Sequence, residues 1–157
     1  MSSNTQTWQP IDPSDSGLPG PVEAALSGAA ASLSCLAMVV APDVDPRWGA
    51  DVSLLIAREL SAKGRKILLA DASFERPVLH EAAGVANGEG ISDVLLYGVS
   101  LRHVSEPIGG GVVLAPTGTP VGDIQELLGH PNWETLVRGF DEAGATILVH
   151  LPSETPG

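Results

Sequence analysis

Charged residues that could meet a phosphate gather in one short loop of the chain. The stretch from Val39 to Asp71 has the pattern strand, loop, helix, strand, in which many proteins hold a nucleotide triphosphate. Its loop carries Asp43, Asp45 and Asp51 around a single cation, Arg47. A carboxylate about 6 Å from a phosphate charge costs roughly 3 kcal/mol at an effective dielectric of about 20. We therefore expect this loop to repel a phosphate; the alternative is an atypical phosphate site built on Arg47.

The same acids suggest a calcium loop, but the spacing argues against it. Counted from Asp43, the sixth loop position is Trp48, where a calcium loop needs glycine for its sharp turn. The twelfth position is Leu54, where such a loop needs a bidentate glutamate. The sequence therefore predicts no metal site here.

Other polar residues permit two interpretations each. Asp71 ends an apolar run, so it is either a turn or capping acid or the remnant of a polar site. Trp48 and Trp133 are either anchors for a partner protein or members of the core. The histidines lack metal-ligand spacing and are interpreted as surface or hydrogen-bonded residues: His80, His103, His130 and His150.

Composition limits the class of protein. The chain has 157 residues, with 19 acidic and 8 basic residues and a net charge of −11, which disfavours nucleic acid and bare membrane as partners. Cys35 is the only cysteine, so the chain can form no intrachain disulfide and no cysteine-based zinc site. Residues 1–20 lack the pattern of a signal peptide and are expected to be a flexible leader. We expect residues 21–157 to form a single domain.

Apolar runs and helical periodicity alternate along this domain. A helical face is expected from Val52, Leu55, Ile56 and Leu60, and that helix should stop at Gly64. Strands are expected at 36–41, 67–70, 111–115 and 146–151, and further helices at 21–34, 77–83, 92–97 and 123–143. This alternation predicts an α/β fold with a mostly parallel sheet and helices on both faces. Ligands of such sheets lie beyond the carboxyl ends of the strands.

Two long segments resemble a known family. They are ILLADASFERPVLHEAAGVANGEGISDVLLYGVSLRHV and VVLAPTGTPVGDIQELLGHPNWETLVRGFDEAGATILVHLPSE. Both are similar to the cytoplasmic catalytic domain of bacterial tyrosine autokinases, which accompany the chain-length and export machinery of capsular and extracellular polysaccharides. That family is related to the cell-division-site and chromosome-partitioning ATPases. The resemblance covers about residues 21–153 and implies a P-loop NTPase-like, three-layer α/β/α fold.

The resemblance also exposes three departures at the loops that hold nucleotide in that family. The Gly-Lys-Ser/Thr end of the family's phosphate loop falls here on Gly49-Ala50-Asp51, without the lysine or the hydroxyl. The family's Asp-Ala-Asp is here Asp71-Ala72-Ser73, and its Asp-Thr-Pro-Pro is here His150-Leu151-Pro152-Ser153. A neutral imidazole is a poor substitute for the hard anionic ligand that Mg²⁺ prefers. The loss of groups at three loops that would face the same Mg²⁺ ion is harder to offset than the loss of a single group.

Features linked to assembly depart from the family too. The family's Glu-x-x-Arg-x-x-Arg, used in ring formation, is here Glu23 followed by Leu26 and Ala29. A tyrosine-rich tail is replaced by Tyr97 as the only tyrosine. The chain also ends soon after His150, so it is expected to be either a fragment or a fold shortened at its C-terminus, with a sheet edge left for a partner to cover.

The sequence thus predicts a non-catalytic, autokinase-like pseudoenzyme that acts through protein contacts in polysaccharide synthesis or export. Its expected partner is the cytoplasmic part of a membrane chain-length or export protein, or an active relative, which would place it in the cytoplasm, peripheral to the inner membrane. No catalytic residue, metal or cofactor is expected. The alternative is an active ATP-dependent tyrosine kinase or ATPase using ATP and Mg²⁺; a positioning switch like the cell-division-site ATPases is a third hypothesis. The degenerate nucleotide positions are predicted to be Asp43, Asp45, Arg47, Gly49, Asp51, Asp71 and His150.

Overall fold

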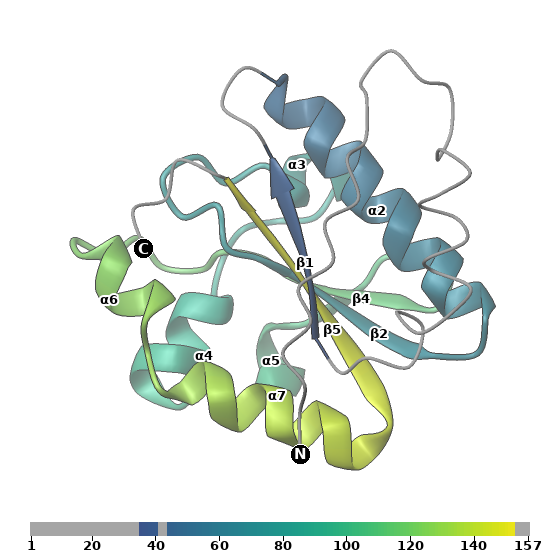
Figure 1. The fold of residues 1–157 in the computed structure, drawn as a ribbon. Coiled ribbons are helices and arrows are strands. Elements are labelled where there is room, and N and C mark those ends of the chain that lie inside the picture. The colour runs from purple at the N-terminus through teal and green to yellow at the C-terminus, as the bar shows by residue number, and fades with distance from the viewer. Residues whose placement is uncertain (1–34, 41–43, 153–157) are drawn as a thin grey trace.

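A mostly parallel sheet forms the centre of the molecule (Figure 1). The computed structural model describes residues 35–40 and 44–152. Within them, five strands lie in the order β1-β5-β2-β4-β3, all parallel to their neighbours except β3, which is antiparallel to β4. The strands are β1 (Cys35–Val40), β2 (Lys66–Asp71), β3 (Glu106–Pro107), β4 (Val112–Ala115) and β5 (Ala145–Pro152).

Because β1, β2, β4 and β5 are parallel, their carboxyl ends lie together along one edge of the sheet. In β5, His150 lies opposite Asp71 of β2, and Pro152 lies opposite Val40 of β1. The central strands β2 and β5 are mainly apolar and almost wholly buried, as expected when both faces of a parallel sheet are covered. The predicted α/β fold with a mostly parallel sheet is therefore confirmed.

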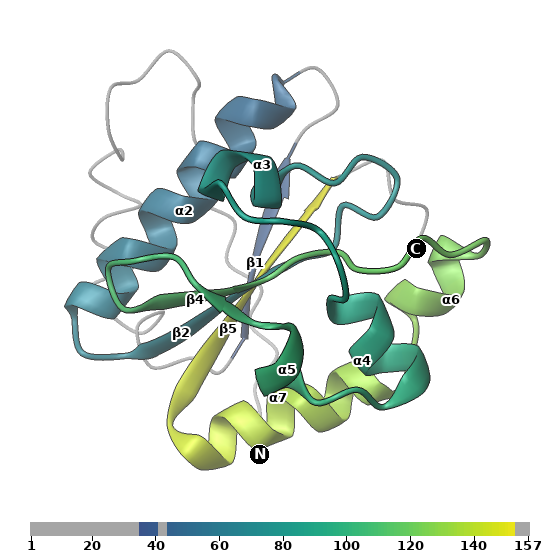
Figure 2. The same ribbon diagram turned by 180° about the vertical axis from the view of Figure 1, so that it is seen from behind.

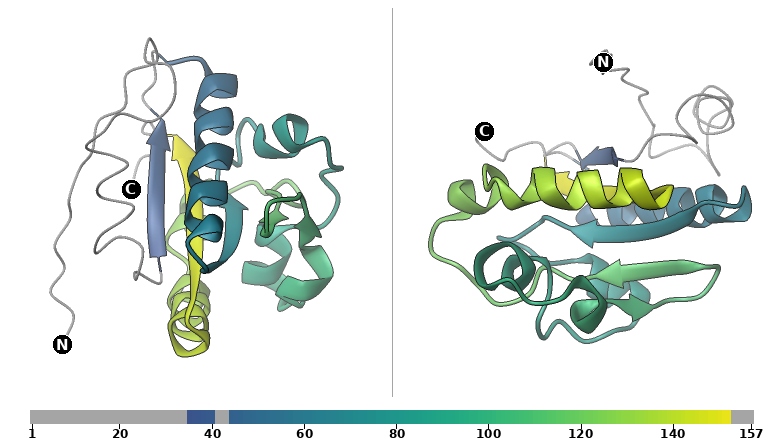
Figure 3. Two further views of the ribbon diagram at one scale, coloured as in Figure 1. Left: turned by 90° about the vertical axis from the view of Figure 1, so that its right-hand side faces the viewer. Right: turned by 90° about the horizontal axis from the view of Figure 1, so that it is seen from below.

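Helices cover both faces of the sheet, which gives three layers (Figure 3). One face carries α2 (Pro46–Ala62) and α3 (Leu79–Ala83), and the other carries α4 (Ile91–Tyr97), α5 (Leu101–Val104), α6 (Ile124–Leu128) and α7 (Asn132–Ala143). In β2, Leu69 points into the core under α2, whereas Leu68 points into the core under α4 and α7. Within the described ranges, no helix combines the length and the apolar character needed to cross a membrane.

The structure refines several predicted elements. Residues 123–143, expected to be mostly helical, form α6 and α7 with a break at Gly129–Pro131. The sequence did not predict α5 or the short strand β3. Gly109, Gly110 and Gly111 join β3 to β4, so the strand expected at 111–115 begins at Val112. All three glycines have positive φ, the region that glycine adopts without strain. The predicted helix at 21–34 and the leader at 1–20 lie outside the described residues, and the single domain over 21–157 stays a prediction.

One residue of the predicted apolar face of α2 does not face the core. Val52, Ile56 and Leu60 are buried, but Leu55 is 38% exposed. The buried side of α2 also includes Ser53. The helix is therefore rotated about its axis relative to the orientation that the four apolar residues predicted. Apolar periodicity could not predict this orientation, because the buried face includes the polar residue Ser53.

Two leucines provide a matched test of this packing. Leu69 is fully buried in the central strand β2, so Leu69→Ala should lower the free energy of unfolding by about 2–5 kcal/mol through lost burial and a residual cavity. Leu55→Ala removes the same atoms from a partly exposed helical site and should change it by less than about 1 kcal/mol. Urea denaturation of both variants measures the difference. Equal losses would contradict the orientation described for α2.

Candidate functional site

The first turn of α2 caps itself with a carboxylate. Asp45 is the N-cap residue, and its Oδ1 accepts a hydrogen bond from the backbone N–H of Arg47 at 3.0 Å. Pro46 occupies the first helical position and has no N–H to offer. The positive end of a helix can bind an anion through its free N–H groups. Here one of these groups is absent and another already faces a negative charge.

The cation of this turn is paired with a neighbouring acid. Arg47 Nε lies 3.4 Å from Asp51 Oδ1, one helical turn away, and both side chains are more than half exposed, at 56% and 59%. An exposed i,i+4 pair of this kind contributes only about 0.3–0.5 kcal/mol. The pair is weak, but it places the Asp51 carboxylate beside the Arg47 guanidinium, the cation that a bound phosphate would need.

The two positions before Asp51 are closed by packing. A Cβ atom added to Gly49 would lie 2.6 Å from Cγ2 of Val40, closer than real Cβ contacts allow. Ala50 is fully buried. In the stretch Gly49-Ala50-Asp51, therefore, the first two residues face the end of β1 and the core, and only the third reaches solvent.

Asp71 is a fully buried acid whose two carboxylate oxygens are both engaged. Its Oδ1 accepts hydrogen bonds from the backbone N–H of Ser73 at 2.9 Å and from the Ser73 hydroxyl. Its Oδ2 accepts from the N–H groups of Val78 and Leu79, at 3.3 and 3.2 Å. Asp71 thus closes the turn after β2 and caps the start of α3, the first of the two interpretations that the sequence allowed.

Beside Asp71 lies a buried histidine and serine pair. Nδ1 of His150 and Oγ of Ser53 are 2.7 Å apart, and both residues are almost fully buried. The pair joins β5 to α2, while the backbone N–H of Ala72 donates to the carbonyl of His150 at 2.7 Å and joins β5 to the end of β2. Burial lowers the pKa of His150, and the charge of the nearby Asp71 only partly opposes this. The imidazole is therefore neutral at pH 7.

A second buried acid, which sequence reasoning missed, ties α4 to the loop after β4. Oδ2 of Asp93 accepts from the N–H groups of Gly90 at 2.8 Å and Thr119 at 3.2 Å, and Oδ1 accepts from the Thr119 hydroxyl at 2.7 Å. Burial would raise the pKa of Asp93, but these hydrogen bonds lower it below its usual value. An acid at the third position of a helix preceded by Gly90 is a capping signal that could have identified it.

The backbone fixes this loop closely. A Cβ atom on Gly90 would lie 2.1 Å from the carbonyl oxygen of Pro116, and one on Gly118 would lie 2.6 Å from Asp93 Oδ2. Ser92 adds a hydrogen bond from its hydroxyl to the carbonyl of Thr119 at 2.9 Å. Asp93, Gly90 and Gly118 therefore hold the loop after β4 against the start of α4.

The structure brings some of the predicted site residues together and separates others. Asp71 and His150 are register partners on adjacent strands. Asp45 is the N-cap of α2, and Arg47, Gly49 and Asp51 lie in its first two turns. Asp43 lies outside the described residues. Among the residues that are described, no group of three His, Cys, Asp or Glu side chains is placed to share a metal ion.

The remaining histidines lie in α3, in α5 and in the turn before α7. His103 Nε2 is 3.4 Å from Glu89 Oε1 at the surface, and His130 Nδ1 accepts from the N–H of Asn132 at 3.1 Å. Nδ1 of His80 is buried without a hydrogen-bond partner in the described part of the chain.

The fold is that of bacterial tyrosine kinase domains. The kinase domain of Escherichia coli tyrosine kinase ETK superposes with a TM-score of 0.70 at 22% identity, over 84% of this chain and 51% of that domain. The kinase domain of VpsO gives 0.73 at 16% identity, over 88% of this chain and 68% of that one. A plasmid partition protein from Borrelia burgdorferi gives 0.50 at 15% identity, over 76% of this chain and 56% of that one.

These likenesses confirm the predicted relation to autokinase and partitioning folds at the level of the backbone. The chain spans about half the length of the ETK kinase domain. No protein-family model and no curated protein matches the sequence.

The hydrogen bonds of Asp71 predict a marked dependence of stability on its charge. Asp71→Asn places an amide group where the carboxylate accepts from backbone N–H groups, so the free energy of unfolding should fall by about 1–3 kcal/mol. Asp51→Asn, which disturbs only an exposed pair, should change it by less than about 0.5 kcal/mol. Chemical denaturation at pH 7 compares the two variants, and similar losses would show that Asp71 is not a capping acid.

The lowered pKa of His150 predicts a loss of stability in mild acid. The unfolded chain takes up a proton at a pKa of about 6.5, above that of the folded state, so the contribution of His150 is complete above this pH and is lost as pH falls toward the folded pKa. Urea denaturation between pH 8 and pH 5 should therefore show a steeper decline for the native chain than for His150→Gln. Parallel profiles would contradict burial of a neutral imidazole.

Proposed function

We propose that this chain is a non-catalytic, autokinase-like protein that acts through protein contacts in the synthesis or export of extracellular or capsular polysaccharide. The sequence motifs resemble the autokinase family, and the backbone resembles proteins named as tyrosine kinase domains, including ETK and BceF. The observation that carries the proposal is the self-capped start of α2, where the Asp45 carboxylate faces the N–H of Arg47.

The other polar groups at this edge of the sheet support the same proposal. A Mg²⁺ ion bound at Asp71 would have to displace hydrogen bonds from Ser73, Val78 and Leu79. The imidazole of His150 is committed to Ser53 inside the core. A magnesium-bound triphosphate fits these residues poorly, because the acids of the described loop repel the phosphates and the Asp71 carboxylate is already engaged.

The proposed partner is the cytoplasmic part of a membrane-bound chain-length or export protein, or an active autokinase with which this chain pairs. Such a partner would hold the chain at the inner face of the membrane. A net charge of −11 favours a protein partner over direct adsorption to an anionic bilayer.

Titration with Mg-ATP tests the loss of nucleotide chemistry. Isothermal calorimetry with the full chain should show no binding tighter than a Kd of about 1 mM, while the ETK kinase domain serves as a positive control for the assay. A Kd in the micromolar range, accompanied by phosphate transfer to tyrosine or by ATP hydrolysis, would instead favour the active-enzyme alternative.

A binding assay tests the partner separately. The full chain should retain the purified cytoplasmic segment of the chain-length protein, or the active kinase, encoded in the same gene neighbourhood. Retention should not change when ATP is added. If none of these components binds, the role in polysaccharide export is wrong even where nucleotide binding is absent.

A further inference from the structure

A groove lies at the end of the sheet opposite to the candidate site. It opens beside α5 and the C-terminal part of α7, which lie on the same face of the sheet (Figure 2), and has a volume of about 590 Å³. Leu68 of β2 and Val113 of β4 are apolar lining residues from the sheet, and Leu101 of α5 and Phe140 of α7 are apolar lining residues from the helices. This volume falls within the roughly 300–1,000 Å³ typical of small-molecule sites.

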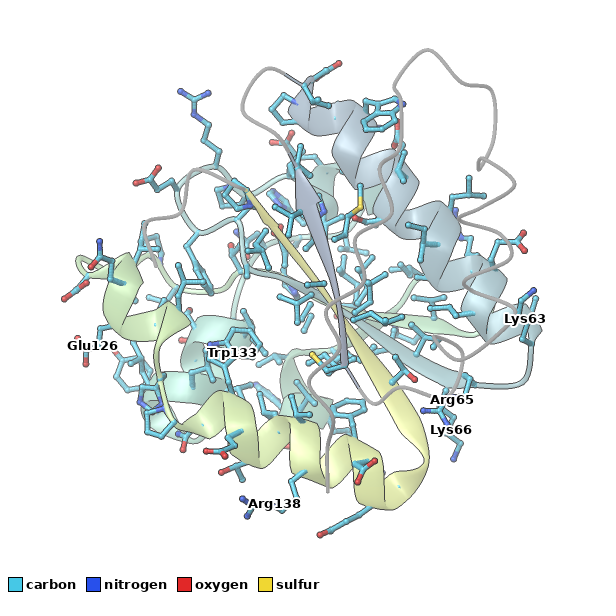
Figure 4. All side chains as sticks on the ribbon, viewed as in Figure 1. Lys63, Arg65, Lys66, Glu126, Trp133 and Arg138 are labelled. Atoms are coloured by element: carbon cyan, nitrogen blue, oxygen red, sulfur yellow. The ribbon has the colours of Figure 1, made fainter. Side chains whose placement is uncertain are left out.

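The charged residues of this groove have a single sign. Its lining includes Lys66 and Arg102 and no carboxylate, although the whole chain has 19 acidic residues and only 8 basic ones. Both side chains are exposed, and within residues 35–40 and 44–152 neither forms an ion pair with a carboxylate. Figure 4 shows Lys66 at the start of β2, well away from Arg138 on α7. The groove is therefore a cationic, mainly apolar concavity on a strongly acidic protein.

Its neighbouring basic groups have other roles. Arg65, next to Lys66 in sequence, donates to the carbonyl of Ala145 at 3.1 Å and to the Thr146 hydroxyl, and so ties β2 to the start of β5. Arg58 donates to the carbonyl of Ile108 at 3.4 Å. These contacts hold the strands that form the groove, whereas Lys66 and Arg102 remain at its surface.

We propose that this groove binds a small amphipathic anion: an apolar chain that lies against Leu68, Val113 and Phe140, with a terminal carboxylate or phosphate reached by Lys66 and Arg102. The apolar lining favours a hydrocarbon body, because its burial removes apolar surface from water. The two cations favour an anionic head group through charge-assisted hydrogen bonds. The excess of acidic over basic residues in the whole chain disfavours such a head group elsewhere. This site does not depend on the proposed function.

A dissolved ligand fits these features better than a membrane surface does. The groove is concave and its cations are two in number, whereas adsorption to an anionic bilayer needs a cluster of several basic residues. The ligand class is therefore a monomeric fatty carboxylate or alkyl phosphate.

Calorimetric titration of the full chain with dodecanoate and with dodecyl phosphate, below their micellar concentrations, tests the proposal. At least one of them should bind with a stoichiometry of one. The double variant Lys66→Gln/Arg102→Gln should weaken that binding by at least about tenfold, because it removes both charged contacts without changing the apolar lining. The matched control Lys63→Gln/Arg138→Gln removes the same charge outside the groove and should change the affinity by less than about twofold.

Two further arms locate the site. Dodecanol should bind at least about tenfold more weakly than dodecanoate, because it lacks the charge. Val113→Phe, checked for native folding by circular dichroism, should abolish binding by filling the groove. The proposal is overturned if neither anion binds, if dodecanol binds equally well, if the two double variants lose affinity equally, or if folded Val113→Phe retains the affinity. Binding to phosphatidylglycerol vesicles without binding of either monomer would also overturn it.

Discussion

Buried polar contacts at the carboxyl ends of β2 and β5 hold together the edge of the sheet around which this protein is organised. Asp71 links the end of β2 to the start of α3, and the Ser53–His150 hydrogen bond links α2 to β5. Such groups are costly to bury unless they are paired, so each depends on its partner remaining in place. The edge at which parallel α/β proteins bind ligands is used here to join elements of the protein to one another.

These polar contacts show why a similar backbone does not imply a similar chemistry. The backbone resembles tyrosine kinase domains, yet likeness of backbone specifies layers and topology and leaves the activity open. What a domain of this kind can do depends on which donors and acceptors remain free at the strand ends. In the described part of this edge, the acids of α2 and β2 already accept hydrogen bonds from the protein itself.

The sequence predicted the architecture better than it predicted the site. Apolar runs were sufficient to predict the parallel strands, because a strand buried on both faces is apolar along most of its length. The orientation of α2 could not be predicted in the same way. Ser53 is buried and bonded to a histidine 97 positions away, while Leu55 is exposed. Asp93 differs from Ser53, because its bond from the N–H of Gly90 is a local signal that the sequence offered, whereas its bonds to Thr119, 26 positions away, leave none. A two-residue strand such as β3 has too few residues to show any periodicity.

The complete burial of Ala50 limits which side chains this position can accept. Ala50 has no exposed surface, so a longer side chain would have to displace its buried neighbours. Lysine, which the autokinase family carries at the position that Ala50 resembles, would in addition bring a charge toward the core. A single substitution to lysine would therefore cost folding stability, whatever the new side chain went on to contact.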